Sequence, residues 1–235
     1  ILGADKVRAA ERWTATELRS GVFLSQPDGT FRFEPAPRLA QISPWQGSVA
    51  GDFDADGNAD LFVVQNSYAP NPVTGRFAGG LGQLMRGDGR GGLTPVAVHA
   101  SGLIVPGDAK ALVTLDFDRD GWPDILASRN NDSTLAFRNG GVPGRRSIRV
   151  DLQGPVGNAS AIGARLSIAR ANGSTSVHEV FAGSGYYSQS AAACFIGYTP
   201  ANAPRSIEVR WPGGKVSTHD VPADSPAVVL RAPAQ

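Results

Sequence analysis

The sequence contains very little sulfur, with one cysteine and one methionine among 235 residues. Because Cys194 is alone, no disulfide bond can form within the chain. Histidine is also scarce. His99, His178 and His219 lie far apart, without the short spacing of a zinc site. Cys194 lies in an apolar run, which predicts a buried, unreactive thiol rather than a nucleophile.

Long apolar runs and clusters of like charge are absent as well. No apolar stretch reaches the roughly 18 residues that a membrane-spanning helix needs. The 22 basic and 21 acidic residues give a formal net charge of +1, and the basic ones are scattered. We therefore expect neither nucleic acid nor a membrane surface as a partner. The sequence also has no G-x-S-x-G or P-loop motif, and we expect no enzymatic activity.

Glycine and proline, by contrast, are abundant, with 29 and 17 residues. Many turns and few helical periodicities favour short strands, so we predict an all-β fold. The one segment with helical spacing is residues 1–20, in which Asp5 would cap a helix presenting Val7, Ala10 and Trp13. An irregular lead-in is nearly as good an interpretation. Residue 1 is Ile, and we expect the sequence to be a piece of a longer protein.

Two nine-residue segments share one acidic pattern, D-x-D-x-D-G-x-x-D. They are residues 52–60 and 116–124, which start 64 positions apart (116 − 52). Four carboxylates so close together repel one another unless a cation neutralises them, and the glycine allows a sharp turn. Oxygen ligands on an acid-rich turning loop are typical of Ca²⁺, so we predict two calcium sites. The alternative is an Asp- and Gly-rich turn without metal.

Each acidic segment is followed by an apolar run, residues 61–64 and residues 125–127, which predicts a buried strand. The unit is therefore strand, loop, strand, unlike the helix-flanked EF-hand. Asp-Gly turns at residues 28–29 and 88–89 add a second repeat, spaced by 60 residues (88 − 28). Such units resemble four-stranded propeller blades. Residues 1–143 provide two to three blades, fewer than the four to eight that close a propeller.

The pattern changes after a Pro/Gly/Arg linker that ends at residue 146. Alternating apolar and polar residues at 147–152, 165–169 and 206–211 are typical of half-buried strands. We predict that residues 146–224 form a separate antiparallel sandwich or barrel and that residues 225–235 form a tail.

The chain resembles known families at several of these segments. The acidic repeats resemble the FG-GAP or VCBS type found in integrin α propellers. The C-terminal part resembles the ASPIC/UnbV domain, through A-I-G-A-R, G-S-G-Y-Y-S-Q-S and V-R-W-P-G-G-K at residues 161–165, 183–190 and 209–215. Their order resembles the C-terminal part of bacterial proteins related to cartilage acidic protein. The combination of segments is more specific than the acidic loops alone.

The resemblance implies a non-catalytic calcium-binding module for adhesion or assembly. Its location would be extracellular, periplasmic or at the cell envelope, and its partners would be other chains or missing blades. The implied ligands are Asp52, Asp54, Asp56, Asn58 and Asp60, and Asp116, Asp118, Asp120, Trp122 and Asp124; Asn58 and Trp122 would act through their backbone carbonyls. The alternative is a carbohydrate-binding or accessory domain of an enzyme, with Tyr186, Tyr187 and Trp211 as its ligand surface.

Overall fold

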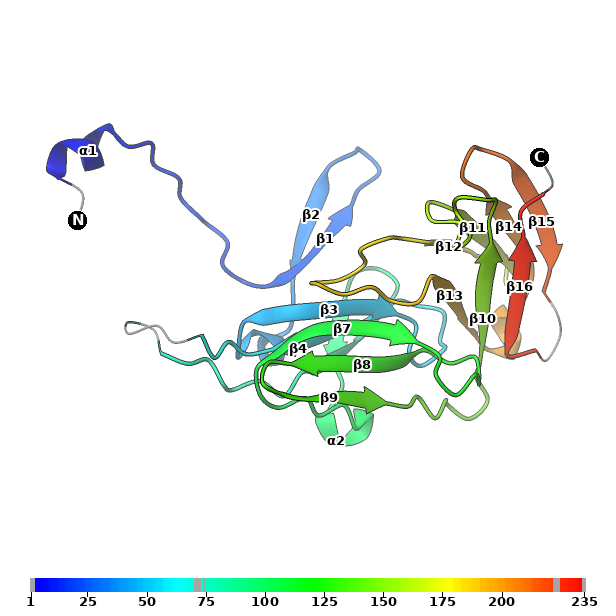
Figure 1. Cartoon of the computed structure of the whole chain (residues 1–235), viewed down its shortest axis with the longest axis horizontal. Helices are drawn as coiled ribbons and strands as arrows, with labels where there is room; N and C mark the ends of the chain where they lie inside the picture. The colour runs from blue at the N-terminus through cyan, green and yellow to red at the C-terminus, as the bar shows by residue number, and fades with distance from the viewer. Residues whose placement is uncertain (1–2, 70–72, 74, 222–224, 234–235) are drawn as a thin grey trace.

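A computed structural model describes residues 3–69, 73, 75–221 and 225–233. The start of the predicted N-terminal helix (residues 1–2), the end of the predicted C-terminal domain (residues 222–224) and the end of the predicted tail (residues 234–235) lie outside the described residues. The described part is built from short strands in five sheets (Figure 1), which confirms the all-β prediction. Among the described residues, all strand pairs are antiparallel except one, formed by β10 and β16.

The N-terminal part contains three sheets that correspond to one partial and two fuller blades. The first sheet is a hairpin, the second has four strands and the third has three. The second and third sheets share a core that includes Phe62, Val64, Leu112 and Ile125. The strands are β1 (Gly21–Ser25), β2 (Phe31–Pro35), β3 (Trp45–Gly51), β4 (Asp60–Gln65), β5 (Gln83–Gly87), β6 (Leu93–Pro95), β7 (Ala109–Leu115), β8 (Asp124–Arg129) and β9 (Asp132–Phe137).

The C-terminal part contains two sheets around a core of its own. The core includes Ile148, Leu166, Ile196 and Ile207, each at most 1 % exposed. The sheet orders are β13-β10-β16 and β12-β11-β14-β15. The strands are β10 (Arg146–Gln153), β11 (Arg165–Arg170), β12 (Thr175–Glu179), β13 (Ala193–Tyr198), β14 (Pro204–Arg210), β15 (Val216–Asp220) and β16 (Ala227–Arg231).

The described part of the chain contains few helices, and they are short. They are α1 (Ala4–Ala9) and α2 (Val98–Ser101), with 3₁₀ turns η1 (Arg38–Gln41) and η2 (Pro200–Asn202). The helix predicted over residues 1–20 is limited to the six residues of α1, and α2 was not predicted at all. No residue of α1 is buried and Trp13 is 86 % exposed. A short helix without a packing partner has little to offset its nucleation cost, so the spacing of apolar residues was misleading here.

The predicted tail is also wrong in part, because residues 227–231 form β16. This strand pairs in parallel with β10, and Leu230 is buried in the C-terminal core. Within residues 146–224, the predicted antiparallel part, the strand pairs of the described residues are all antiparallel; the parallel pairing comes from β16, which lies beyond that range. A parallel neighbour distant in sequence leaves no hairpin signal, and the Ala/Pro content of the segment hid its Val228–Leu230 run.

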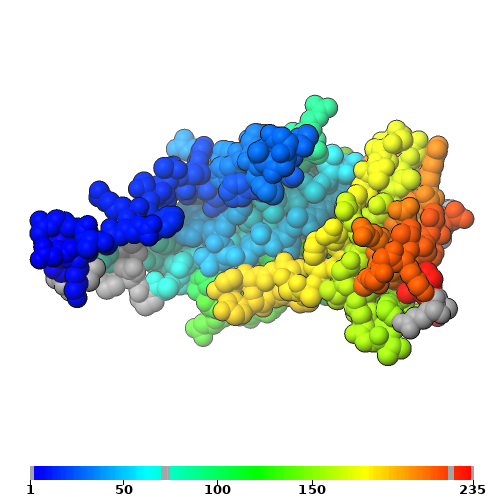
Figure 2. Space-filling view, turned by 90° about the horizontal axis from the view of Figure 1, so that it is seen from above, coloured from blue at the N-terminus to red at the C-terminus, as the bar shows by residue number. Residues whose placement is uncertain are grey.

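The C-terminal sheets lie at one end of the row of blades, and the N-terminal segment extends from the opposite end (Figures 1 and 2). The segment between β12 and β13 reaches back over the blades. Ser188 Oγ donates to Leu112 O at 3.0 Å, and Ala191 N donates to Thr114 O at 2.9 Å. These bonds occupy part of the free edge of β7, which would otherwise present unpaired backbone groups.

Candidate metal centres

The two acidic segments occupy equivalent places in neighbouring sheets. Residues 52–59 connect β3 to β4, and residues 116–123 connect β7 to β8. Each glycine of the pattern has a left-handed backbone, with φ of 95° at Gly57 and 87° at Gly121. The residue two positions before each glycine also has a left-handed backbone, with φ of 56° at Ala55 and 66° at Arg119. Each loop thus contains two left-handed residues at matching positions, one of which is the glycine that the pattern requires.

The first aspartate of each loop accepts hydrogen bonds from its own turn. Asp52 accepts from the backbone N–H groups of Asp56 and Gly57, at 3.0 and 2.9 Å. Asp116 accepts from Asp120 and Gly121 in the same way, at 3.1 and 3.3 Å. The same scaffold therefore recurs in both loops, as the repeat in sequence predicts.

The last aspartate of each loop joins the loop to the next hairpin. Asp124 is fully buried and accepts from Phe117 N at 3.0 Å and from Asn139 N at 2.8 Å. Asp60 is 3 % exposed and accepts from Phe53 N and from Gly87 N, both at 3.0 Å. Each carboxylate thus has a structural role beyond any cation it would bind, and the acidic pattern alone did not indicate this role.

Three carboxylates converge in each loop, with one oxygen of each within 4.8 Å of the others. The groups are Asp52, Asp54 and Asp60 in the first loop and Asp116, Asp118 and Asp120 in the second. Asp56 and Asp124, also predicted as ligands, lie outside these groups. Asp56 Oδ1 instead accepts from Asn58 N at 2.8 Å, and the equivalent bond joins Trp122 N to Asp120 Oδ1 at 2.9 Å.

The electrostatics of the first loop suit a cation. Burial, followed by repulsion from neighbouring carboxylates, raises the pKa of Asp52 to about 7 and that of Asp60 to about 6. The pKa of Asp124 in the second loop is raised for the same reasons. Asp54 Oδ2 is buried and, among the residues described, accepts no hydrogen bond; Arg86 reaches it only as an ion pair. Asp54, whose Oδ2 accepts no hydrogen bond, and two carboxylates whose anionic form is destabilised fit the donor set that Ca²⁺ requires.

Arginines approach both loops from outside. Arg86 Nε and Arg145 Nη1 lie 2.8 and 2.7 Å from the carboxylate of Asp54. Arg138 pairs with Asp118, and its Nη2 lies 3.2 Å from Asp120. These guanidinium groups neutralise part of the negative charge, and each of them is at least 29 % exposed on the loop surface.

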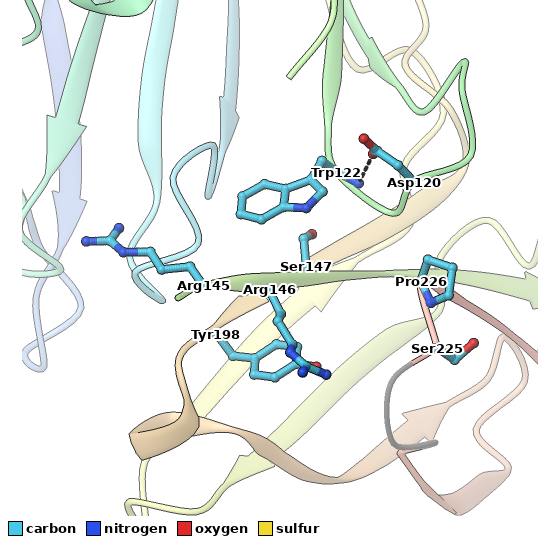
Figure 3. Close-up of a pocket in the computed structure, with 8 residues that line it drawn as sticks. All are labelled: Asp120, Trp122, Arg145, Arg146, Ser147, Tyr198, Ser225 and Pro226. Atoms are coloured by element: carbon cyan, nitrogen blue, oxygen red, sulfur yellow. Dashed lines mark hydrogen bonds between the residues drawn. The ribbon is translucent and has the colours of Figure 1, made fainter. Parts of the chain in front are cut away.

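A cavity of about 170 Å³ lies beside the second loop, where it meets the C-terminal sheets (Figure 3). Trp122 and Asp120 line one side of it, while Arg145 points away, toward its partner Asp54. Ser147 is 6 % exposed, and within the described part of the chain its hydroxyl has no hydrogen-bond partner. The remaining lining residues are Arg146, Tyr198, Ser225 and Pro226.

The three aromatic residues predicted as a ligand surface do not share one. Tyr186 and Tyr187 are 50 % and 92 % exposed on the segment between β12 and β13, where their rings meet edge to face. Trp211 is 3 % exposed in the C-terminal core, and its indole N–H donates to Ser217 Oγ at 2.8 Å. Burial of Trp211 removes it from contact with any ligand, which corrects that prediction.

Comparisons with known proteins match both parts of the chain. Residues 154–235 match the family model described as ASPIC and UnbV, and residues 13–63 match the model of an FG-GAP-like repeat. The chain is 25 % identical over 203 residues to cartilage acidic protein 1 of Mus musculus, covering 85 % of this chain and 30 % of that protein. The chain is also 25 % identical over 194 residues to cartilage acidic protein 1 of Homo sapiens, covering 81 % of this chain and 28 % of that protein. The chain therefore spans less than a third of these relatives.

Proposed function

Because the chain carries an FG-GAP-like repeat and an ASPIC/UnbV domain, we propose that it is a non-catalytic, calcium-binding module for adhesion or assembly. It would work in the extracellular space, the periplasm or the cell envelope, as part of a longer protein or of a complex. The observation that carries the calcium assignment is the pair of loops with one hydrogen-bond scaffold and three converging carboxylates each.

The chain's own residues would hold each cation between two strands of a blade. Asp52, Asp54 and Asp60 would ligate it in the first loop, and Asp116, Asp118 and Asp120 in the second. A bound Ca²⁺ supplies the positive charge that offsets repulsion among these carboxylates. The backbone bonds to Asp52 and Asp116 fix the turns in advance, which lowers the entropic cost of binding. The result would be two rigid links between consecutive strands.

The proposed partners are further blades or other chains. One face of the β7–β9 sheet covers the shared core, through Leu112 and Ala127 among others. The opposite face carries a cross-strand row of Val113, Leu126 and Ala136, which is half-buried to exposed. An apolar row of this kind is suited to packing against another sheet. No helix within the described residues is long and apolar enough to cross a membrane.

Calcium titration with thermal unfolding tests the proposal. Ca²⁺ that binds only the folded chain stabilises it by about 2.7 kcal/mol per site at roughly 100 times Kd, so Tm should rise with Ca²⁺ and fall when a chelator removes it. Asp54→Asn should remove the contribution of the first loop and Asp118→Asn that of the second. Asp28→Asn, in the β1–β2 turn, is the matched control and should keep the full response. A Tm that changes neither when Ca²⁺ is added nor when a chelator removes it would refute calcium binding.

A further inference from the structure

The C-terminal sheets pack directly against the first acidic loop. The contact is made by the segment from Gly197 to Asn202, which contains the end of β13 and the turn η2 and which we call the β13–η2 corner. The side-chain amide of Asn202 donates to Asp56 O at 3.3 Å. The same amide nitrogen lies 2.8 Å from the position that a Cβ on Gly57 would take.

Gly197 lies against the carboxylate of Asp52. A Cβ at position 197 would overlap Asp52 Oδ2 and would lie 2.6 Å from Ala55 Cα. The φ of Gly197 is not in the left-handed region, so what requires glycine here is the lack of space rather than the backbone conformation. Asp52 is one of the three carboxylates that converge in this loop. The position of its oxygen therefore depends on a residue of the C-terminal sheets.

The corner is held mainly by residues of the C-terminal part, in addition to its contact with the loop. Arg170, on β11, is 6 % exposed and donates to Gly197 O at 2.9 Å and to Asn202 O at 3.3 Å. Asn202 Oδ1 also accepts from the backbone N–H and the hydroxyl of Thr199, which closes the turn. Because a buried guanidinium and a capped turn hold the corner, it presents a rigid surface to Asp52 and Asp56.

We propose that the β13–η2 corner is the outer wall of the first cation site, with Gly197 and Asn202 as positioning residues for its aspartates. The inference rests on the proposed calcium function and extends it, since the site becomes one built from both parts of the chain. Cation binding in the first loop and docking of the C-terminal sheets are then coupled. Coupling free energies are reciprocal, so each event strengthens the other.

Isothermal calorimetry with Ca²⁺ on the whole chain tests this coupling. Asp118→Asn with Asp120→Asn silences the second loop and leaves the first to be measured alone. In that background Gly197→Ala should weaken Ca²⁺ binding roughly tenfold or more, because the new methyl displaces Asp52. Gly140→Ala is the matched control, since its methyl meets nothing within 4 Å, and it should leave the affinity unchanged. In the reciprocal Asp54→Asn background, Gly197→Ala should leave the affinity of the second loop unchanged.

Hydrogen exchange on the unmodified chain provides a measurement that does not depend on how Gly197→Ala folds. Ca²⁺ should slow amide exchange at residues 197–202, which are not ligands, as well as in the loop at residues 52–58. The distal turn at residues 211–216 should be unaffected. Wild-type affinity in a folded Gly197→Ala chain would overturn the inference and leave the calcium proposal intact, as would protection confined to the loop. If the unmodified chain takes up no Ca²⁺, both proposals fall.

Discussion

At the residue scale, the surroundings of His178 oppose its protonation. Burial, and then the positive charge of Arg170, lowers the pKa of His178 from 6.5 to about 4. The folded state therefore binds this proton less readily than the unfolded state does. The contribution of His178 to stability is fully present above pH 6.5 and is lost as pH falls toward 4. The whole effect is on the order of 3 kcal/mol, from about 1.4 kcal/mol per pKa unit.

We predict that His178→Gln reduces the acid sensitivity of the free energy of unfolding between pH 6.5 and 4. Urea titrations at several pH values, with wild type and variant side by side, measure the difference, and contributions from other groups then cancel. His99→Gln serves as the control, because His99 is exposed on α2. Identical pH slopes for wild type and His178→Gln would show that His178 titrates normally.

At the element scale, the aspartates of one acidic loop have different roles: the last one is buried and structural, and others are more exposed. Asp124 is fully buried and accepts two backbone N–H groups, whereas the side chain of Asp118 is 27 % exposed and pairs with Arg138. Asp124→Asn would turn an amide N–H₂ toward one of these donors and leave it unsatisfied. We expect a loss of about 1–3 kcal/mol even in chelator.

The same measurement distinguishes the two roles within one loop. Asp118→Asn should be nearly neutral in chelator and should destabilise the chain only when Ca²⁺ is present. Chemical unfolding of both variants with and without Ca²⁺ gives all four values. Equal behaviour of the two variants in chelator would contradict the structural assignment of Asp124.

The segment between β12 and β13 covers part of the free edge of β7 and hydrogen-bonds to its backbone. Ser190 Oγ accepts a hydrogen bond from Thr114 N at 3.1 Å, on the free edge of β7. Ser190→Ala should therefore leave a half-buried backbone donor unsatisfied and cost about 1 kcal/mol or more. Ser174→Ala, in the exposed turn after β11, is the control and should have little effect. An unchanged urea midpoint in Ser190→Ala would mean that water replaces the hydroxyl without cost.

At the scale of the whole molecule, the face of the β7–β9 sheet that points away from the shared core is the surface best suited to packing against another chain. We predict that the isolated chain associates in a concentration-dependent way and that Leu126→Glu weakens this association. A charge in the middle of the row formed by Val113, Leu126 and Ala136 would have to be desolvated on packing. Multi-angle light scattering across a dilution series measures the effect.

The control for association is Val216→Glu, which changes an apolar residue of the C-terminal sheets that is 54 % exposed. It should leave the molecular mass at each concentration unchanged. A chain that stays monomeric at all concentrations before any substitution would show that this face of the β7–β9 sheet tolerates water. The adhesion and assembly proposal would then need a different surface.

The sequence alone determined the local chemistry of this protein. The acidic pattern, its glycine and the apolar run after it were enough to predict the strand–loop–strand units, because hydrogen bonding in a tight loop depends on neighbours in sequence. The all-β class followed from turn residues and alternation for the same reason. The tertiary structure decided what no short pattern records. It made β16 a parallel partner of β10, buried Trp211 away from Tyr186 and Tyr187, and brought Gly197 against Asp52, since contacts between distant segments depend on packing of the whole chain.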